Sequence, residues 1–290
     1  MNTDMNKIES DFAQGQTAGN YRRWLYSLIL YLLTPLVLLR LFWRAKKLPA
    51  YMRHWQHRFG WIQVPEGFQH GIWIHAVSFG ETQAAKPLIA RLQELYVDTP
   101  ILITNSTPTG ASLAQHTWGE SLFQCYAPYD LPSVVNRFIG RTKPRLAIFM
   151  ETEIWPNQIH QLQQRGVPIL LVNARLSEKS AKGYQRFSAL TKDTLNKLTL
   201  ATVQDEADAA RFKSLGMADE KIKVTGSIKS DLFIPPSLVE AGHALRATLG
   251  AHRPVVIAAS THEGEETLVL SAFKELTKLV PEVLLILVPR

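Results

Sequence analysis

The stretch GIWIHAVSFGETQAAKPLIARLQELY, residues 71–96, decides the fold. Its first part, Ile72–Val77, is a short apolar run, which predicts a buried strand. Its second part, Thr82–Tyr96, has apolar side chains at helical spacing, which predicts an amphipathic helix. A buried strand that turns directly into a helix is the unit from which parallel α/β sheets are built.

The same alternation continues along the chain and extends the prediction to a whole domain. Strands separated by short helices imply right-handed crossovers and a parallel sheet, with ligands at the carboxyl ends of the strands. The further strands are predicted at Pro100–Thr104, Leu122–Ala127, Arg145–Met150, Val167–Val172, Leu200–Val203 and Lys221–Thr225, and the helices at Thr109–His116, Leu131–Gly140, Asn157–Arg165 and Asp205–Leu215.

A second α/β unit begins after a Pro-containing break. Its strand starts at Val255, its helix is Glu265–Leu279, and a second strand is Val283–Val288. One such unit is too small to be stable alone. We therefore expect a first Rossmann-like domain at 49–230, a linker at 231–254, and only the start of a second, truncated domain at 255–290.

The N-terminal region is read as a tail followed by a membrane anchor. Residues 1–20 are polar and aperiodic, which predicts a flexible tail. Trp24–Leu39 is almost wholly apolar, and with its flank to Trp43 it has the length of a bilayer span. It could instead lie in the interface as an amphipathic element, or be a buried soluble helix. We assign 21–48 to the anchor and its basic flank.

The charge is concentrated beside this anchor. Residues 21–60 carry eight Lys and Arg and no acid, whereas the whole chain has a net charge of +7. The excess therefore belongs to one local surface, which argues against nucleic-acid binding. Basic residues are denser after the anchor than before it, which favours a cytoplasmic main domain. The single cysteine, Cys125, lies in an apolar strand and excludes an internal disulfide, as expected in a reducing compartment.

Two motifs contain acids directly after predicted strands. In HAVSFGE, residues 75–81, Gly80 permits a tight turn, and Glu81 could serve as a general base. Ser78 and Glu81 are equally spaced as a capping box, and a helix N-terminus would keep the carboxylate ionised. In METEIWPN, residues 150–157, Glu151 and Glu153 stand beside a Trp, which indicates either a cleft wall or an ordinary surface loop.

Three further turns could hold anions or be ordinary caps and turns. They are NSTPTG (105–110), TGSIKSD (225–231) with Lys229, and ASTHEGEE (259–266) with His262. No cluster has metal-ligand spacing, and neither GxGxxG nor a P-loop is present.

Together these motifs resemble those of bacterial 3-deoxy-D-manno-octulosonic acid (Kdo) transferases, glycosyltransferase family 30. The resemblance covers about residues 25–290 and rests on an ordered set: HAVSFGE, NSTPTGA (105–111), YAPYDLP (126–132), METEIWPN, LVNARLSEKS (171–180), TGSIKSD, AASTHEGEE (258–266) and LVPR (287–290).

The resemblance implies a GT-B fold, with two Rossmann-like domains and an N-terminal anchor helix. It implies transfer of Kdo from CMP-Kdo to a lipid A precursor in lipopolysaccharide biosynthesis, inverting and metal-independent, with no cofactor. It places the enzyme at the cytoplasmic face of the bacterial inner membrane. The family chain continues through a full second domain, so the activity of this chain alone is in doubt.

The resemblance also assigns roles to residues. Glu81 matches the general base, and Glu151 and Glu153 match a second acidic motif. The implied substrate-binding residues are Ser78, Gly80, Lys229, Ser260, Thr261, His262, Glu263 and Arg290. The residues expected to hold the acceptor phosphates at the membrane are Arg44, Lys46, Lys47, Arg53 and Arg58.

Two alternatives remain open at this point. The first is another membrane-associated GT-B enzyme, for example one that uses a UDP-sugar. The second is a truncated chain that binds lipid without turnover.

Overall fold

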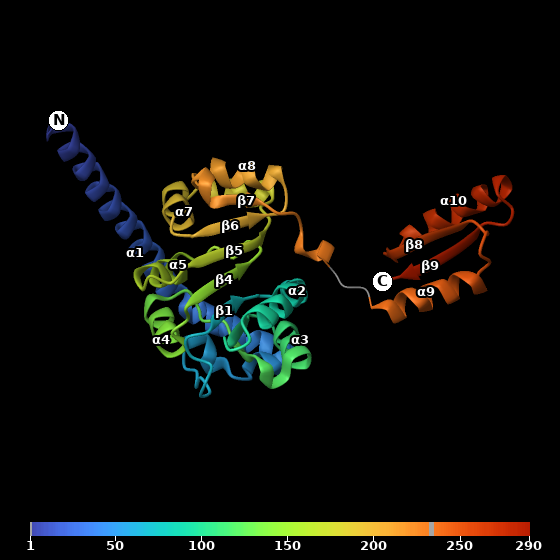
Figure 1. The fold of residues 1–290 in the computed structure, drawn as a ribbon, viewed down its shortest axis with the longest axis horizontal. Helices are drawn as coiled ribbons and strands as arrows, with labels where there is room; N and C mark the ends of the chain where they lie inside the picture. Colours follow the sequence, from blue (N-terminus) through green and yellow to red (C-terminus); the bar gives the residue numbers. More distant parts are fainter. Residues whose placement is uncertain (1, 232–234) are drawn as a thin grey trace. The chain divides into compact units, whose positions relative to one another are not determined.

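The computed structural model describes the backbone of residues 2–231 and 235–290, and the side chains of residues 21–229 and 235–290. The chain divides into two compact units, Met1–Leu232 and Phe233–Arg290 (Figure 1). Within the described residues, the first unit contains a seven-stranded sheet and the second a two-stranded one, and all pairings are parallel.

The sheet of the first unit has the strand order β3-β2-β1-β4-β5-β6-β7. β1 pairs with β2 on one side and β4 on the other, so Ile72 lies opposite both Ile101 and Leu146. The order reverses between β1 and β4, and open α/β sheets bind ligands beyond the strand ends at this switch point. The strands are β1 (Ile72–His75), β2 (Ile101–Asn105), β3 (Phe123–Tyr126), β4 (Leu146–Met150), β5 (Ile169–Ala174), β6 (Leu200–Val203) and β7 (Ile222–Val224).

Helices follow the strands and cover both faces of this sheet. Ser78, Thr107, Ser177 and Asp205 are N-caps whose side chains accept from backbone N–H groups, which explains where four of these helices begin. The helices are α2 (Phe79–Leu95), α3 (Pro108–Trp118), α4 (Pro132–Thr142), α5 (Pro156–Gln164), α6 (Glu178–Gln185), α7 (Ser188–Leu195) and α8 (Glu206–Ser214), and the short 3-10 turns are η1 (Pro49–Met52), η2 (Trp55–Phe59), η3 (Gly119–Ser121), η4 (Asp219–Lys221) and η5 (Ile228–Asp231).

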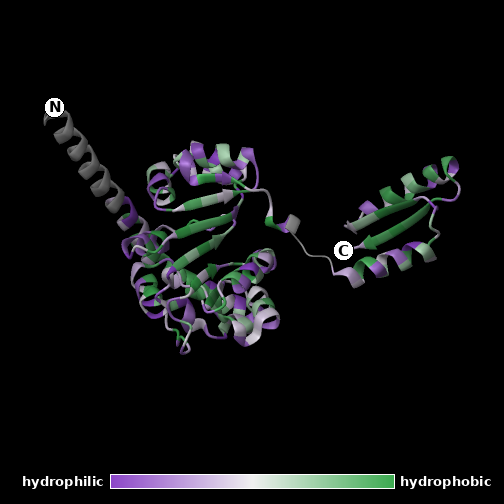
Figure 2. Cartoon of the chain, in the orientation of Figure 1, coloured by the Kyte–Doolittle hydropathy of each residue, from purple (hydrophilic) through white to green (hydrophobic). Residues whose placement is uncertain are grey.

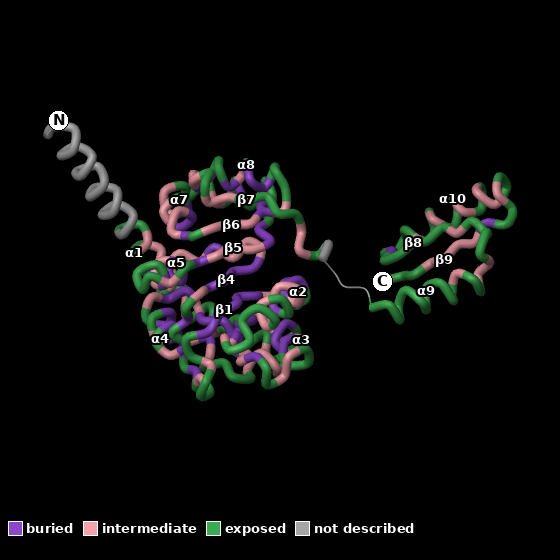
Figure 3. The backbone as a smooth tube through the Cα atoms, viewed as in Figure 1, coloured by how far each residue is buried: buried purple, intermediate pink, exposed green. Residues whose placement is uncertain are grey.

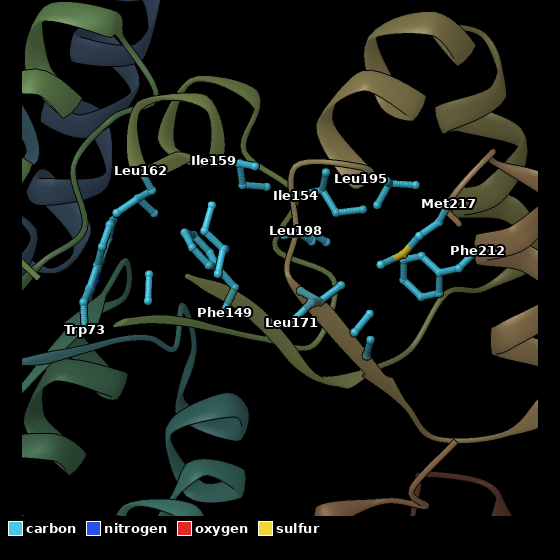
Figure 4. Close-up of a cluster of buried hydrophobic side chains, with 14 of the residues drawn as sticks. Trp73, Phe149, Ile154, Ile159, Leu162, Leu171, Leu195, Leu198, Phe212 and Met217 are labelled. Carbon is cyan, nitrogen blue, oxygen red and sulfur yellow. The ribbon is translucent and has the colours of Figure 1, made fainter. Parts of the chain in front are cut away.

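Each face of the sheet has its own hydrophobic core, because side chains alternate along a strand. Trp73 of β1 packs with α4 and α5, and its ring lies 4.8 Å from that of Phe138. Its neighbours Ile72 and Ile74 face the opposite way, into the core under α2 and α3. Figure 4 shows the first cluster, and Figures 2 and 3 show that the central strands of the sheet, such as β4, are both apolar and buried.

The N-terminal helix α1 extends from Asn2 to Lys47. Its backbone therefore includes most of residues 1–20, where we expected a flexible tail. Extending an existing helix costs less than nucleating a new one, which explains the continuation into a polar sequence. Within α1, Tyr21–Lys47 is long and apolar enough to cross a membrane, and only 11% of its most apolar window is buried.

One side of α1 is attached to the first unit by polar contacts. Tyr26 donates its hydroxyl hydrogen to Asp130 Oδ2 at 3.0 Å, and Ser27 donates to Asn157 Oδ1 at 3.1 Å. The other side is apolar and exposed, with Leu32 70% exposed. A buried soluble helix would have this surface covered, so the exposed apolar surface favours membrane association.

The second unit contains α9 (Pro236–Thr248), β8 (Val255–Thr261), α10 (Glu265–Leu279) and β9 (Leu284–Pro289). β8 and β9 pair in parallel, with a register shift between Ala259 and Thr261. The βαβ prediction for this region is confirmed.

Three helices were missed by the sequence argument. α9 occupies much of the segment expected to be a linker, because Pro236 begins the helix instead of breaking it. α6 and α7 are eight residues each, too short for a periodic apolar pattern to stand out.

Candidate active site

The candidate site lies beyond the carboxyl ends of β1 and β4. HAVSFGE continues from β1 and METEIWPN continues from β4. These two strands are neighbours in the sheet although far apart in sequence. Parallel pairing therefore brings both acidic motifs to the switch point, as expected.

Glu81 is in the first turn of α2 and is 9% exposed. Ser78 Oγ accepts from the Glu81 backbone N–H at 3.3 Å, so the expected helix cap is present. The Glu81 carboxylate accepts from the Val77 backbone N–H at 2.6 Å and from the Ser78 hydroxyl at 3.0 Å. The side chain that completes the cap is thus the same one that the resemblance implies as a base.

The electrostatic environment of Glu81 differs from the one that the sequence predicted. Burial, followed by the nearby charge of Glu153, raises the pKa of Glu81 from its ordinary 4.5 to about 7. The hydrogen bonds from Val77 and Ser78 oppose this rise without cancelling it. We expected the helix N-terminus to hold the carboxylate firmly ionised; desolvation outweighs that effect. A pKa near 7 suits a group that must accept a proton at neutral pH.

Glu153 is held between an indole and an imidazole. Trp155 donates its indole N–H to Glu153 Oε2 at 2.6 Å, and His75 Nε2 lies 3.7 Å from the same oxygen. The His75 ring is fixed from behind by Thr104, with Nδ1 2.8 Å from Oγ1. His75 begins the HAVSFGE motif, but the sequence argument did not select it. The signal that could have selected His75 is a polar ring at the end of an apolar strand.

Glu151 and Lys229 form an ion pair that joins a third motif to the site. Lys229 Nζ lies 3.3 Å from Glu151 Oε1. The turn that carries Lys229 is tied to β5, because the Ile228 backbone N–H donates to Asn173 Oδ1 at 3.1 Å. Glu151 and Asn173 both have left-handed backbones, with φ of 56° and 57°. Strained residues of this kind cluster at functional sites.

The roles first considered for Gly80 and for the NSTPTG turn need correction. Gly80 is within α2 and not at a positive-φ turn, and a Cβ there would meet only Ser78 Oγ, at 4.0 Å. In the NSTPTG segment, Thr107 caps α3 by accepting from the Gly110 N–H at 3.2 Å. A Cβ on Gly110 would lie 3.1 Å from the Ser78 carbonyl carbon. This turn therefore supports the backbone around Ser78.

The predicted donor-binding residues of the second unit lie near one another. Arg290 Nη1 is 3.4 Å from His262 Nε2, and the Arg290 backbone N–H donates to the Thr261 carbonyl at 3.1 Å. Ser260, at the register shift of β8, has φ of 60°. Glu263 is exposed in the turn before α10. These residues form a polar strand-end cluster on this unit.

The five basic residues predicted to hold phosphates differ in their surroundings. Arg44, Lys46, Lys47 and Arg53 are exposed. Arg58 is only 4% exposed, donates to the Ser106 carbonyl at 3.0 Å, and stacks over the Tyr126 ring at 4.3 Å. Arg58 is therefore packed into the folded unit, unlike the four exposed basic residues.

The single cysteine belongs to the core of the first unit. Cys125 is buried in β3, and burial raises the pKa of its thiol strongly, which disfavours a thiolate. Among the described side chains, no group of three or more His, Cys, Asp or Glu could hold a metal ion.

A solved structure shares this fold. It is UDP-GlcNAc 2-epimerase from Neisseria meningitidis, with a TM-score of 0.53 and 14% identity over 75% of this chain and 64% of that one. With the strand order and the strand-end site, this likeness defines the chain as a protein of the GT-B fold class.

The sequence comparisons identify the family within this class. A family model described as 3-deoxy-D-manno-octulosonic-acid transferase (kdotransferase) matches residues 53–232, and the chain belongs to the Kdo transferase family. It is 39% identical to the Haemophilus influenzae 3-deoxy-D-manno-octulosonic acid transferase over 92% of this chain and 63% of that protein. It is 34% identical to the Bordetella pertussis enzyme of the same name, over 92% and 64%. The chain thus spans under two thirds of the length of these relatives.

Proposed function

We propose that the protein transfers Kdo from CMP-Kdo to a hydroxyl group of a lipid A precursor, with inversion and without a metal ion or cofactor. The observation that carries the proposal is the buried carboxylate of Glu81 at the switch point, with its pKa raised to about 7. Family membership supports the transferred sugar, and the position and pKa of Glu81 support its role as general base.

The proposed reaction begins with proton transfer from the acceptor hydroxyl to Glu81. Glu81, when ionised, accepts the proton of the acceptor hydroxyl as its oxygen bonds to the anomeric carbon of Kdo. The bond from that carbon to the CMP phosphate breaks, and its electron pair leaves with CMP. Loss of the base removes about 10²- to 10⁴-fold in rate. In this proposal Glu151, Glu153, Ser78 and Gly80 line the acceptor side.

The donor side is assigned to Lys229 and to the polar cluster of the second unit. Lys229 is positioned by its pair with Glu151 and is half exposed, so it can reorient towards an anionic group. Arg290 and His262 would supply positive charge or hydrogen bonds to the departing phosphate. Ser260, Thr261 and Glu263 complete this proposed donor set.

A lipid acceptor is supported by an apolar groove beside the acids. The groove has a volume of about 800 Å³ and lies between α1 and the loop region around α6 and α7. Leu25, Tyr26 and Ile29 of α1 line one wall, and Phe187 lines the other. Glu153 and Trp155 line the same groove, which connects the candidate membrane helix with the acidic motif.

We place the protein at the inner membrane with the first unit on the cytoplasmic face. The support is the exposed apolar surface of α1 and the basic residues Arg44, Lys46 and Lys47 in its last turn. Such a cluster attracts anionic lipid headgroups and favours the cytoplasmic side.

The decisive experiment is a transfer assay with CMP-Kdo and a lipid A precursor. The complete reading frame that encodes this sequence is compared with its Glu81→Gln variant, which is expected to lose at least about a hundredfold in turnover. Glu94→Gln is the matched control, because Glu94 is an exposed acid on the same helix.

Three results would contradict the proposal. Normal turnover by the Glu81→Gln enzyme would remove the base assignment. Transfer from a UDP-sugar in place of CMP-Kdo would indicate another GT-B enzyme. Lipid binding without any transfer would indicate a non-enzymatic role.

A further inference from the structure

A second cavity, of about 270 Å³, lies between α1 and the carboxyl edge of the first unit's sheet. α1 contributes Arg40 and Arg44 to its wall. Arg58, His75 and Gln158 line it from the sheet side. At ~30 Å³ for each water molecule, it has room for a phosphate group and part of its ester.

Three buried polar atoms in this wall have no hydrogen-bond partner among the described residues: Arg58 Nε, His75 Nε2 and Gln158 Oε1. Their side chains are 4%, 1% and 1% exposed. Buried polar atoms are nearly always paired, and three orphans around one cavity indicate a polar group that occupies it.

The charge of the wall indicates the kind of group. Arg40, Arg44 and Arg58 contribute positive charge, and Asp130 is the acid that lines the cavity. Both Asp130 oxygens are already used: Oδ1 accepts from Gln158 N–H, and Oδ2 accepts from Asn157 N–H and from the Tyr26 hydroxyl. The positive charge that remains in the wall therefore favours an anionic group, and guanidinium groups match phosphate geometry.

His75 and Gln158 add a hydrogen-bond donor and a hydrogen-bond acceptor to the charged groups of the cavity wall. When Thr104 donates its hydroxyl hydrogen to His75 Nδ1, the proton of the ring is on Nε2. Nε2 lies 3.7 Å from Glu153 Oε2, which is beyond hydrogen-bond distance, so this N–H is left to donate to a bound group. Gln158 Oε1 is an acceptor and suits a hydroxyl group, either of a singly protonated phosphate or of the sugar that bears it.

We propose that this cavity binds the phosphate monoester of a membrane lipid headgroup. The lipid source is indicated by the walls: Val37 and Leu41 of the candidate membrane helix line the cavity, and Trp155 lines both this cavity and the apolar groove. A lipid whose chains lie along the groove can therefore place its phosphate here. This inference rests on the proposed function, because it names the phosphate subsite of the proposed acceptor.

The first test measures binding of radiolabelled inorganic phosphate to the detergent-solubilised chain by equilibrium dialysis. Arg40→Gln/Arg44→Gln removes two charges from the wall at exposed positions, so the fold is retained. We expect affinity at least about tenfold lower, as for the loss of a charge-assisted contact. Arg58→Lys, which loses the planar fork, is expected to weaken binding similarly.

The matched control is Lys179→Gln/Lys182→Gln, which removes two charges from exposed positions of α6 that do not line the cavity. Its phosphate affinity is expected to stay within about twofold of the parent chain. An equal loss in both double variants would mean diffuse electrostatic attraction and would overturn the site.

The second arm distinguishes a lipid phosphate from free phosphate. Micelles that contain phosphatidic acid, a phosphate monoester lipid, compete with the labelled phosphate, and phosphatidylcholine micelles serve as the comparison. We expect phosphatidic acid to compete at least about tenfold better than inorganic phosphate. Competition no better than inorganic phosphate would overturn the lipid assignment.

Failure of this proposal is separable from failure of the proposed function. The binding measurements need no CMP-Kdo and no turnover, so an inactive protein that binds phosphatidic acid in the cavity supports the subsite alone. An active transferase whose Arg40→Gln/Arg44→Gln variant binds phosphate normally would refute the subsite alone.

Discussion

At the scale of single residues, Glu81 completes a helix cap and is also the proposed general base, two interpretations that compete in a sequence argument. Its carboxylate accepts from the Val77 N–H and the Ser78 hydroxyl, which completes the start of α2. The same burial that makes these bonds possible removes water from the carboxylate and raises its pKa to about 7. A cap and a base are therefore compatible readings of this side chain.

The raised pKa of Glu81 predicts a pH-dependent cost in stability. Between pH 4.5 and 7 the unfolded chain releases this proton while the folded chain keeps it, so the folded state loses stability as pH rises through this window. The full effect of a shift from 4.5 to about 7 is about 3 kcal/mol. Glu81→Gln removes this term. The difference in unfolding free energy between the variant and the parent chain should therefore favour the variant more at pH 8 than at pH 5.

Urea unfolding of both proteins at the two pH values measures this difference. The exposed-acid variant Glu94→Gln should show no such change between pH 5 and pH 8. If Glu81→Gln changed the free energy of unfolding by the same amount at both pH values, Glu81 would not be desolvated as described.

At the scale of elements, Asp130 connects three parts of the first unit. It precedes α4, caps the N-terminus of α5 through Asn157 and Gln158, and accepts from Tyr26 of α1. Burial raises the pKa of Asp130 to about 7. The position of α1 is thus coupled to the helix that begins directly after Trp155.

Replacing Asp130 by Asn should loosen this junction. Both carboxylate oxygens accept from backbone N–H groups, so the amide of Asn would point an N–H at another donor. At pH 4 the raised pKa keeps the carboxyl protonated in the folded chain, so the cost of ionising it scarcely enters. There we expect Asp130→Asn to lower the free energy of unfolding by about 2 kcal/mol, since a buried hydrogen bond is lost and an N–H faces another donor. Urea unfolding monitors the change.

Tyr26→Phe is the matched control for this junction, because it removes one hydrogen bond and leaves both backbone bonds in place. It should cost only about 1 kcal/mol. Equal effects of the two changes would show that the hydroxyl, and not the helix cap, holds the junction together.

At the scale of the whole molecule, the distribution of apolar surface separates α1 from the cores of the first unit. The sheet buries its apolar side chains under helices on both faces, whereas Leu32 and Leu36 of α1 are 70% and 61% exposed. An exposed apolar surface of this kind marks a contact with lipid or protein. Its length in Tyr21–Lys47 matches a bilayer.

Charges on this surface should release the chain from the membrane. Leu32→Glu/Leu36→Glu places two acids within the apolar window, and each charged residue costs about 3 kcal/mol at the centre of a membrane helix. We expect the variant to move from the membrane pellet to the soluble fraction after a carbonate wash.

Leu95→Glu/Val97→Glu is the control for this fractionation, because these exposed apolar residues lie at and beyond the end of α2. That variant should stay in the pellet with the parent chain. Retention of the α1 variant as well would mean that α1 is not the anchor.

Most of the fold was predictable from local pattern. Strand and helix periodicity, short connections and right-handed crossovers lead to a parallel sheet, and the ends of the predicted elements fall within a few residues of those observed. The short helices α6 and α7 and the Pro-initiated α9 were missed. Their existence depends on packing and capping more than on a periodic apolar pattern.

By itself, the sequence determined the parallel α/β class, the membrane-helix candidate with its basic flank, and the acidic motifs at strand ends. These are properties of composition and spacing. Only the tertiary structure decided that Glu81, Glu151, Glu153 and Lys229 meet, that desolvation of Glu81 outweighs its helix position, and that Arg58, His75 and Gln158 surround a cavity. The physical reason is that burial and proximity between distant segments arise from the order of the strands, which no local pattern contains.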